Sequence, residues 1–462
     1  MSENKQPAEN APKFAGIEVP PELSKTNFFF LFFCTFIIGM FMSIPAIIQP
    51  AFLKEIIKIN PDFAGSVNGL LQNMSQIATL LFVAAIGALS DKTGRKILAF
   101  FSFVVMAIAF YCFGISNAIA EVLNIPSGFA ATVCATLSFM PDKAAAFETF
   151  APGLLVTYIM RFIIGIGLIL GYPQFITMVA DYTYEKDRGK GMAGNGVAMG
   201  LASILVFGIF GVIVKKMGVI SGINAAAILA VIGMVFTWIF LKDRMPERAQ
   251  VKKGGLKEVF PVVKKSISLK VSYMCSLITR ADIIILATFL VTWSVQSADK
   301  FGLTSGAATG KAMIPMIVMG VVSLFAFPVI GILLDKWGRI PTILLSLVGA
   351  AAGMLLIAVA PSPFSWMIYV AVVLAGVGMA GSIAGANTLA TDASPKSMVG
   401  SILGGLNTMQ PIGAIFFVAA GGFLFDKLGP GASFVLKGLA NLLLFIWIFM
   451  IKGAIQAERE DT

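Results

Sequence analysis

Apolar stretches of about twenty residues recur along the whole chain and are separated by shorter polar segments. An α-helix needs about 20 apolar residues to cross the roughly 30 Å hydrocarbon core of a bilayer. Twelve membrane-spanning helices are therefore predicted, at residues 27–50, 65–89, 96–115, 151–180, 190–214, 220–241, 278–298, 311–334, 340–360, 364–390, 400–424 and 431–451. Twelve crossings leave both termini on one side of the membrane.

The composition agrees with this pattern. Hydrophobic residues make up 58% of the 462 residues and charged residues only 13%, whereas soluble proteins carry about 25% charge. We therefore expect a polytopic, all-α membrane protein without a soluble domain. The first 26 residues lack the charged, apolar and small-residue order of a cleaved signal, so the first span is expected to be retained.

The net charge of +10 is distributed unevenly about the predicted spans. Of the 34 Lys and Arg residues, 24 fall on the side of the termini. Basic loops remain in the cytoplasm, so we expect cytoplasmic termini and, in a bacterium, a location in the inner membrane. The topology accounts for the charge, and nucleic acid is not an expected partner.

The lack of His and the wide spacing of the four Cys residues exclude several functions. The chain has no His, and Cys34, Cys112, Cys134 and Cys275 lack metal-ligand spacing. His-ligated metal sites and Ser/His or Cys/His nucleophile pairs are therefore excluded. We expect neither an enzyme nor a bound metal or cofactor.

The two halves of the chain repeat each other. GALSDKTGR at 87–95 returns as GILLDKWGR at 331–339, an offset of 244. A gapless register at an offset of 211 pairs Asp181 with Asp392. Two related six-helix bundles of the same orientation are a recurrent plan of transporters. The expected units are a cytoplasmic tail at 1–26, bundles at 27–241 and 278–451, a cytoplasmic linker at 242–277 and a cytoplasmic tail at 452–462.

The two offsets differ by 33 residues, so the first half carries an insertion, and residues 117–149 have room for it. Its apolar core at 127–140 is too short to cross a bilayer. We predict an amphipathic helix or cap on the outer surface. It is either a tolerated surface insertion or a functional lid.

The repeated segment suits a hinge between two helices. Gly87 allows close helix packing, Asp91 is an acceptor for the N-terminus of a neighbouring helix, and Gly94 permits a positive-φ turn. Arg95 can hold Asp91 or another carboxylate. The second copy supplies Gly331, Asp335, Gly338 and Arg339.

This segment resembles the signature loop of the major facilitator superfamily, which has a weaker copy between helices 8 and 9. RFIIGIG at 161–167 resembles the helix-4 motif of that family, although Ile164 occupies the position where Gln is usual. The resemblance implies the twelve-helix fold of the superfamily. It also implies rocker-switch alternating access around one central site between two bundles.

For individual residues the resemblance implies a conformational gating motif. Asp91 and Arg95 would form a charge relay with Asp181 at the inner end of helix 4. Asp91 would dock near Gly400, at the start of helix 11, when the inner gate is shut. Asp335 would dock in the same way at the start of helix 5.

Arg161 lies within the fourth span and aligns with Val372, so its charge has no counterpart in the second half. An Arg near the centre of a span costs roughly 2.5–3.5 kcal/mol on insertion scales. It either binds an anionic group or gates proton coupling from the cavity, or it bonds polar groups of its own bundle. The sequence leaves both interpretations open.

Polar residues on other spans are candidates for the lining of the cavity. Span 2 carries one polar stripe of Asn68, Gln72, Ser75 and Gln76. This stripe either lines the cavity or forms hydrogen bonds to neighbouring helices. The predicted substrate-cavity set is Arg161, Tyr158, Gln174, Gln49, Gln72, Gln76, Thr292, Trp293, Gln296, Asn387, Asn407 and Gln410.

Proton coupling normally uses a carboxylate inside the membrane. Asp282 is the best titratable candidate, although with Arg280 it also fits a paired residue at the inner start of span 7. Lys437 in span 12 is expected to snorkel outward.

These features favour a secondary active transporter, symporter or antiporter, that works as a monomer in the lipid bilayer. Its expected cargo is a small organic solute, with an anion as one option, and H+ is the expected coupling ion. One alternative is a multidrug/proton antiporter, although Gly200 and Leu201 occupy the place of the usual Gly-Pro pair. The other is a transport-inactive sensor or assembly factor with the same fold.

Overall fold

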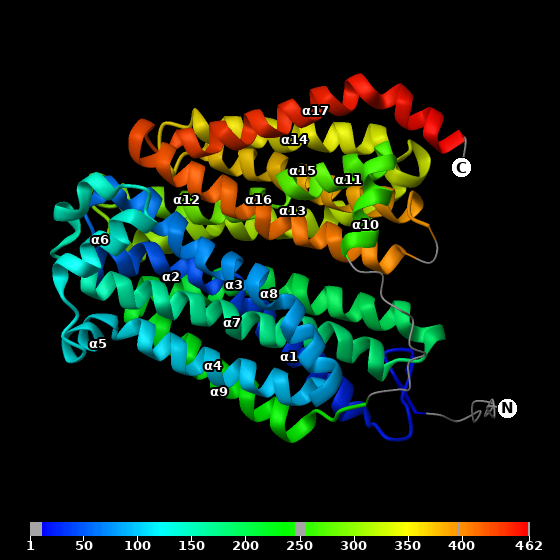
Figure 1. The fold of residues 1–462 in the computed structure, drawn as a ribbon, viewed down its shortest axis with the longest axis horizontal. Coiled ribbons are helices and arrows are strands. Elements are labelled where there is room, and N and C mark those ends of the chain that lie inside the picture. The colour runs from blue at the N-terminus through cyan, green and yellow to red at the C-terminus, as the bar shows by residue number, and fades with distance from the viewer. Residues whose placement is uncertain (1–11, 245–255, 396–397, 461–462) are drawn as a thin grey trace.

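The computed structural model describes residues 12–244, 256–395 and 398–460, and most of them are helical. Within these residues twelve segments are long and apolar enough to cross a membrane, which confirms the predicted number (Figure 1). The first six spans are α1 (Lys25–Phe41) with α2 (Ile44–Phe52), α3 (Ala64–Thr93), α4 (Arg95–Gly114), α7 (Ala151–Tyr182), α8 (Arg188–Met217) and α9 (Val219–Phe240). The last six are α11 (Ile267–Thr279) with α12 (Asp282–Gln296), α13 (Ser305–Lys336), α14 (Arg339–Ala358), α15 (Trp366–Asp392), α16 (Val399–Leu428) and α17 (Gly431–Glu460).

The spans form two bundles that lie side by side, α1 to α9 and α11 to α17 (Figure 1). Between the bundles, α3 packs along α16 and α8 packs along α13. The end of the molecule with the turns at Gly94 and Gly338 is called the motif end below. The opposite end carries α5 (Ser116–Val122) and α6 (Ser127–Leu137) and is called the insertion end.

The seventh span begins at Ile267, well before the predicted start at 278. Its first half, α11, carries several hydroxyl residues, which lower its apparent hydropathy. Ser272 and Thr279 donate to carbonyls one turn back in the same helix, Thr279 to Cys275 at 2.9 Å, whereas Ser276 donates to the carbonyl of Leu406 on α16 at 2.8 Å. The linker boundary is therefore corrected: its helix α10 (Leu256–Lys265) ends just before the span. As a result, Asp282 lies in the middle of a span instead of at its inner start.

The insertion lies at its own end of the molecule as α5, α6 and a 3-10 segment at Pro141–Phe147. It packs on the start of α7 and the loop before α3, where Phe147 stacks on Phe63 with 4.8 Å between ring centroids. Its helix α6 is apolar, but with 11 residues it is too short to span a bilayer. The insertion thus forms a helical cap at this end of the molecule, and its location on the outer side of the membrane stays a prediction.

The chain before α1 forms an antiparallel hairpin of β1 (Lys13–Phe14) and β2 (Ile17–Glu18). An ion pair between Glu18 and Lys186 holds this hairpin against the turn between α7 and α8. The sequence predicts only a polar tail there, because two-residue strands carry no periodic signal.

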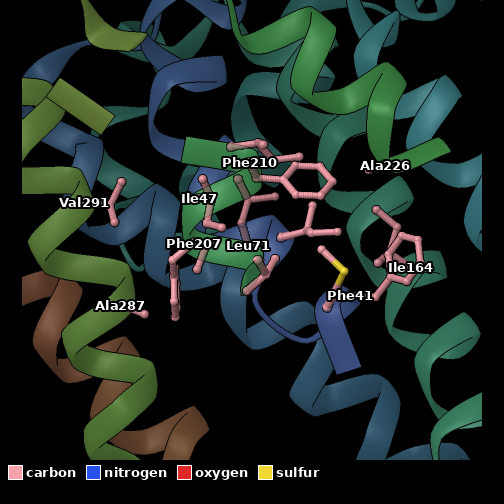
Figure 2. Close-up of a cluster of buried hydrophobic side chains, with 14 of the residues drawn as sticks. Phe41, Ile47, Leu71, Ile164, Phe207, Phe210, Ala226, Ala287 and Val291 are labelled. Atoms are coloured by element: carbon pink, nitrogen blue, oxygen red, sulfur yellow. The ribbon is translucent and has the colours of Figure 1, made fainter. Parts of the chain in front are cut away.

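In their insertion-end halves the two bundles share one continuous apolar cluster. Figure 2 shows Ile47, Leu71 and Phe207 of the first bundle gathered beside Ala287 and Val291 of α12. Burial of this apolar surface stabilises the contact between the bundles. It also closes the space between them on that side.

Candidate functional site

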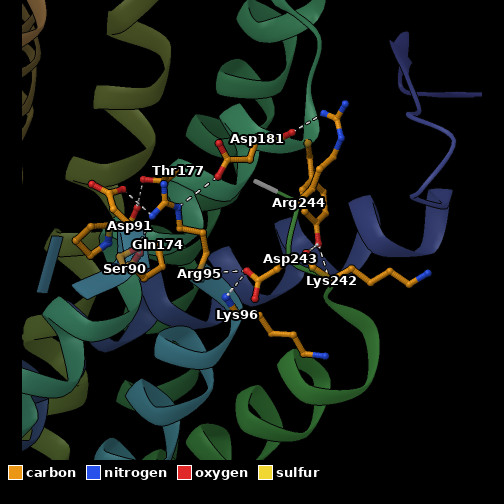
Figure 3. Close-up of polar contacts among 12 residues, drawn as sticks. Ser90, Asp91, Arg95, Lys96, Gln174, Thr177, Asp181, Lys242, Asp243 and Arg244 are labelled. Atoms are coloured by element: carbon orange, nitrogen blue, oxygen red, sulfur yellow. Dashed lines mark hydrogen bonds and ion pairs between the residues drawn. The ribbon is translucent and has the colours of Figure 1, made fainter. Parts of the chain in front are cut away.

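The motif end of the first bundle holds a network of polar side chains around Arg95 (Figure 3). The buried guanidinium of Arg95 pairs with Asp91 at 2.9 Å and with Asp181, at the end of α7, at 3.3 Å. It also donates to Ser90 at 2.7 Å, and Ser90 bonds to Gln174. The three residues of the expected charge relay are therefore in contact. Gln174 takes part in this network through Ser90.

Gly94 makes the turn into α4 with a φ of 92°, a conformation that favours glycine. The carboxylate of Asp243, just past α9, accepts from the backbone N–H groups of Arg95 and Lys96, both at 2.8 Å (Figure 3). A negative charge stabilises a helix N-terminus in this way. A Cβ at Gly94 would come within 2.7 Å of Asp243 Oδ2. The sequence reasoning missed Asp243, which lies in an irregular segment without a motif.

The second bundle repeats this network around Arg339. Its guanidinium pairs with Asp335 and with Asp392, both at 3.0 Å. Asp392 is the repeat partner of Asp181, so the repeat register already contained the signal for this contact. Gly338 makes the turn before Arg339 with a φ of 94°.

The first glycine of each motif copy is open in this conformation. A Cβ at Gly87 or Gly331 would meet no described heavy atom within 4 Å outside its own helix, and the same holds at Gly400. The close helix approach expected at Gly87 is therefore not made here. The docking of Asp91 near Gly400 and of Asp335 at the start of α8 stays a prediction for another conformation.

Arg161 of α7 is only 1% exposed and points toward α3. It donates to Ser75 and, at 3.2 Å, to Gln72. The polar stripe of α3 thus holds this charge inside the first bundle. This geometry matches the second interpretation of Arg161, in which it bonds polar groups of its own bundle.

Other residues of the predicted cavity set lie in separate places. Tyr158 is buried, and its hydroxyl lies 3.1 Å from that of Ser138 in the insertion. Gln296 donates to the carbonyl of Pro61 at 2.8 Å, at the insertion end, and Thr292 lines a small pocket beside it. Buried or half-buried positions on α2, α3 and α12 are occupied by Gln49, Gln76 and Trp293.

Three predicted cavity residues of the second bundle converge on Arg280, at the break between α11 and α12. Its guanidinium donates to Asn387 and Asn407 at 2.8 Å each and reaches Gln410 at 3.5 Å. The side chain is half-buried, and Tyr172 of the first bundle is near enough to interact with its charge. The sequence reasoning did not include Arg280 in the cavity, because it placed this residue at the inner start of the span.

Asp282 lies two residues further on and is fully buried against α17. Its carboxylate is 2.9 Å from Lys437 Nζ and accepts from Asn441 at 3.0 Å. Lys437 also donates to the carbonyl of Ile278 at 2.7 Å, and its Nζ lies 4.0 Å from the centroid of the Phe417 ring. The expectation that Lys437 snorkels outward is wrong, because partners inside the bundle already satisfy its charge.

Polar contacts join the two bundles at the insertion end. Lys54 of the first bundle pairs with Asp299 of the second at 2.7 Å. Asp426, near the end of α16, accepts from the backbone N–H groups of Gly65 and Ser66 at 2.7 and 2.8 Å. These two N–H groups belong to the first turn of α3, so Asp426 caps this helix across the interface.

The same interface is open toward the motif end. All five residues at 81–85 of α3 are exposed. Five consecutive positions extend over more than one helical turn, so the exposed stretch includes the side of α3 toward the second bundle, while Phe82 also contacts Phe162 of α7. On the second bundle a pocket of about 430 Å³ adjoins the Arg280 site and is lined by Asn387, Thr388, Thr391, Asp392, Leu403 and Asn407.

The comparison with protein families agrees with this architecture. The family model of the Major Facilitator Superfamily matches residues 31–323 and 275–460. With its twelve candidate spans and its two motif networks, the chain belongs to the major facilitator superfamily of membrane transporters.

Individual relatives include magnetosome proteins and, over a shorter stretch, tetracycline resistance proteins. Magnetosome protein MamH of Paramagnetospirillum magneticum is 29% identical over 88% of this chain and 88% of its own length. Magnetosome protein MamZ of Magnetospirillum gryphiswaldense is 26% identical over 93% of this chain and 62% of its own length. The class D tetracycline resistance protein of Salmonella ordonez is 33% identical, over 29% of this chain and 34% of its own length.

Among solved structures, a mutant of the nucleoside transporter NupG superposes with a TM-score of 0.72. The superposition covers 92% of this chain and 99% of that one, at 14% sequence identity. This likeness concerns the fold alone.

Proposed function

We propose that this protein is a secondary active transporter that carries a small organic solute across the membrane by rocker-switch alternating access. The observation that carries this proposal is the unequal closure of the bundle interface. At the insertion end Lys54 and Asp426 make contacts across the interface, whereas toward the motif end residues 81–85 of α3 are all exposed. A transporter with one central site opens to one side at a time, and this conformation fits one of its two states.

The networks around Arg95 and Arg339 support rigid-body movement of the two bundles. Each network ties the start of one span to the end of another span of the same bundle. Asp91 and Asp335 lie at the surface of each bundle, and we propose that they dock on the opposite bundle when the motif end closes. Because most basic residues lie at this end, we propose that it faces the cytoplasm together with both termini. The conformation would then be open inward.

We propose H+ as the coupling ion and Asp282 as its carrier. A proton on Asp282 would leave the ammonium of Lys437 without a counter-charge inside the bundle. Breaking a buried ion pair in this way costs about 3–5 kcal/mol. Movement of α12 relative to α17 would relieve that cost, and α12 follows directly on the helix break at Arg280. Protonation would thereby be linked to the position of the span that lines the cavity.

Solute flux in proteoliposomes of the purified full-length chain tests this proposal. We expect at least one solute among organic acids, nucleosides, sugars and amino acids to show counterflow and to accumulate under an imposed pH gradient. Asp282→Asn should abolish accumulation and retain counterflow, whereas Asp142→Asn, an exposed carboxylate of the insertion, should retain both. Absence of counterflow for every class contradicts transport. Accumulation that survives Asp282→Asn contradicts the coupling role alone.

The partial similarity to a tetracycline resistance protein favours a second candidate, export of amphiphilic drugs in exchange for protons. This candidate predicts that deletion of the gene raises sensitivity to several unrelated drugs. It also predicts drug-stimulated proton release from loaded proteoliposomes. A solute transporter of narrow specificity would produce neither result.

A further inference from the structure

We infer that Arg280 is the recognition charge of a binding site for a small organic anion with a carboxylate or phosphate group. This inference rests on the proposed transport function and specifies the substrate class. It assigns the anion to the second bundle, on the face toward Tyr172 of α7, and not to Arg161.

The first argument is charge. Among the described residues, the partners of the Arg280 guanidinium are the amide oxygens of Asn387, Asn407 and Gln410, and no carboxylate lies within ion-pair distance. The neighbouring Asp282 is already paired with Lys437. A cation in the middle of a span is therefore held by neutral groups, although an uncompensated charge there is costly. An anionic ligand would supply the missing counter-charge.

The second argument is the set of donors. An Asn side chain whose oxygen accepts from Arg280 still has an NH2 group with two donors. Asn387 and Asn407 both line the pocket of about 430 Å³ next to Arg280, together with the hydroxyls of Thr388 and Thr391. In addition, the buried Nε of Arg280 has no hydrogen-bond partner among the described atoms. Guanidinium N–H groups in a planar fork match the oxygens of a carboxylate or phosphate.

The third argument is access. Arg280 is half-buried and lies beside a pocket that is lined at its far side by Asp392, at the motif end. Arg161 is 1% exposed and already engaged by Ser75 and Gln72. An anion that enters between the bundles from the motif end would therefore meet Arg280 and not Arg161.

Thermal unfolding of the purified full-length protein with a probe panel tests the inference. The panel contains acetate, succinate, citrate and glucose 6-phosphate, with glucose and glycerol as neutral controls. We expect at least one anion to raise the Tm of the wild type, because a ligand stabilises the folded state that it binds. Arg280→Gln should abolish this shift. Arg280→Lys should weaken the apparent affinity about tenfold, because a lysine lacks the bidentate fork. Lys264→Gln, which removes an exposed charge on α10, should leave the shift unchanged.

Several outcomes would overturn the inference. One is an equal anion-induced shift in wild type and Arg280→Gln, and another is stabilisation by the neutral solutes alone. If Arg280→Gln does not fold, Asn387→Ala and Asn407→Ala replace it, and each should reduce the affinity for the same anion. Counterflow of a neutral solute that survives Arg280→Gln would disprove the anion site and leave transport intact. Counterflow that is missing for every solute would disprove the proposed function itself.

Discussion

At the scale of single residues, the second bundle contains an ion pair that is shielded completely from solvent. Asp282 and Lys437 are both 0% exposed and lie on different spans. Removal of both charges from water is costly, and their attraction offsets that cost only while both remain. The stability of the bundle therefore depends on the pair as a unit.

This dependence predicts a non-additive result. Lys437→Met should lower the free energy of unfolding by about 3–5 kcal/mol, because it leaves a buried carboxylate without its partner. The double variant Lys437→Met with Asp282→Leu should recover most of that loss, because an apolar pair of similar volume can replace a buried ion pair. Thermal unfolding of the four proteins in one detergent measures this double-mutant cycle. Simple additivity of the two single effects would contradict a coupled pair.

The two motif glycines provide a matched pair of substitutions. Gly94 and Gly338 have nearly the same φ, 92° and 94°. A Cβ at Gly94 would meet Asp243 at 2.7 Å, whereas the nearest atom at Gly338 is 4.0 Å away. Gly338→Ala should cost about 1–3 kcal/mol for the backbone conformation alone. Gly94→Ala should cost more, because it also displaces the cap of α4. Equal losses in thermal unfolding would show that Asp243 moves aside freely.

At the scale of elements, the insertion-end contact between α3 and α16 depends on one carboxylate. Asp426 accepts two backbone N–H groups from the first turn of α3. Hydrogen bonds to a charged group contribute about 1.5–3 kcal/mol each. If the insertion end opens during the transport cycle, these bonds must break.

Asp426→Asn should therefore shift the protein toward the state that is open at the insertion end. Asn68, which is buried in the pocket at that end, is a suitable reporter after replacement by Cys. Its modification by a membrane-impermeant maleimide should become about tenfold faster in the Asp426→Asn background, because each 1.4 kcal/mol corresponds to a tenfold change in population. Lys427→Gln, at the exposed neighbouring position, is the control. An unchanged rate would mean that Asp426 does not hold the interface closed.

The elements also show what the sequence could and could not predict. Hydropathy predicts the twelve spans because crossing a bilayer imposes a length on every helix, and the resemblance to the superfamily implies the contact of Arg95 with Asp91 and Asp181. The same hydropathy misplaced the start of α11, because the hydroxyl residues of this helix are satisfied by groups inside the protein and are therefore tolerated in the membrane. Because of that error, the prediction placed Arg280 and Asp282 at the inner end of the span, whereas they lie in its middle. Their partners on α15, α16 and α17 come from distant parts of the chain, which no local pattern reveals.

At the scale of the whole molecule, the two bundles are joined at the insertion end and exposed to each other's side at the motif end. The apolar cluster at Phe207 and Val291 and the ion pair of Lys54 with Asp299 belong to the joined end. The repeated motif networks belong to the open end. Alternating access requires that the motif end closes when the insertion end opens, since a solute released on one side must be inaccessible from the other.

Distances between spin labels in a lipid bilayer test this exchange most directly. One pair of labels replaces Lys92 and Lys336, the repeat partners at the motif end, and a second pair replaces Lys58 and Lys300 at the insertion end; all four positions are exposed. On addition of a solute that shows counterflow, we predict a population with a shorter distance at the motif end and a longer distance at the insertion end. Distances that stay fixed at both ends, or that change in the same direction, would contradict alternating access.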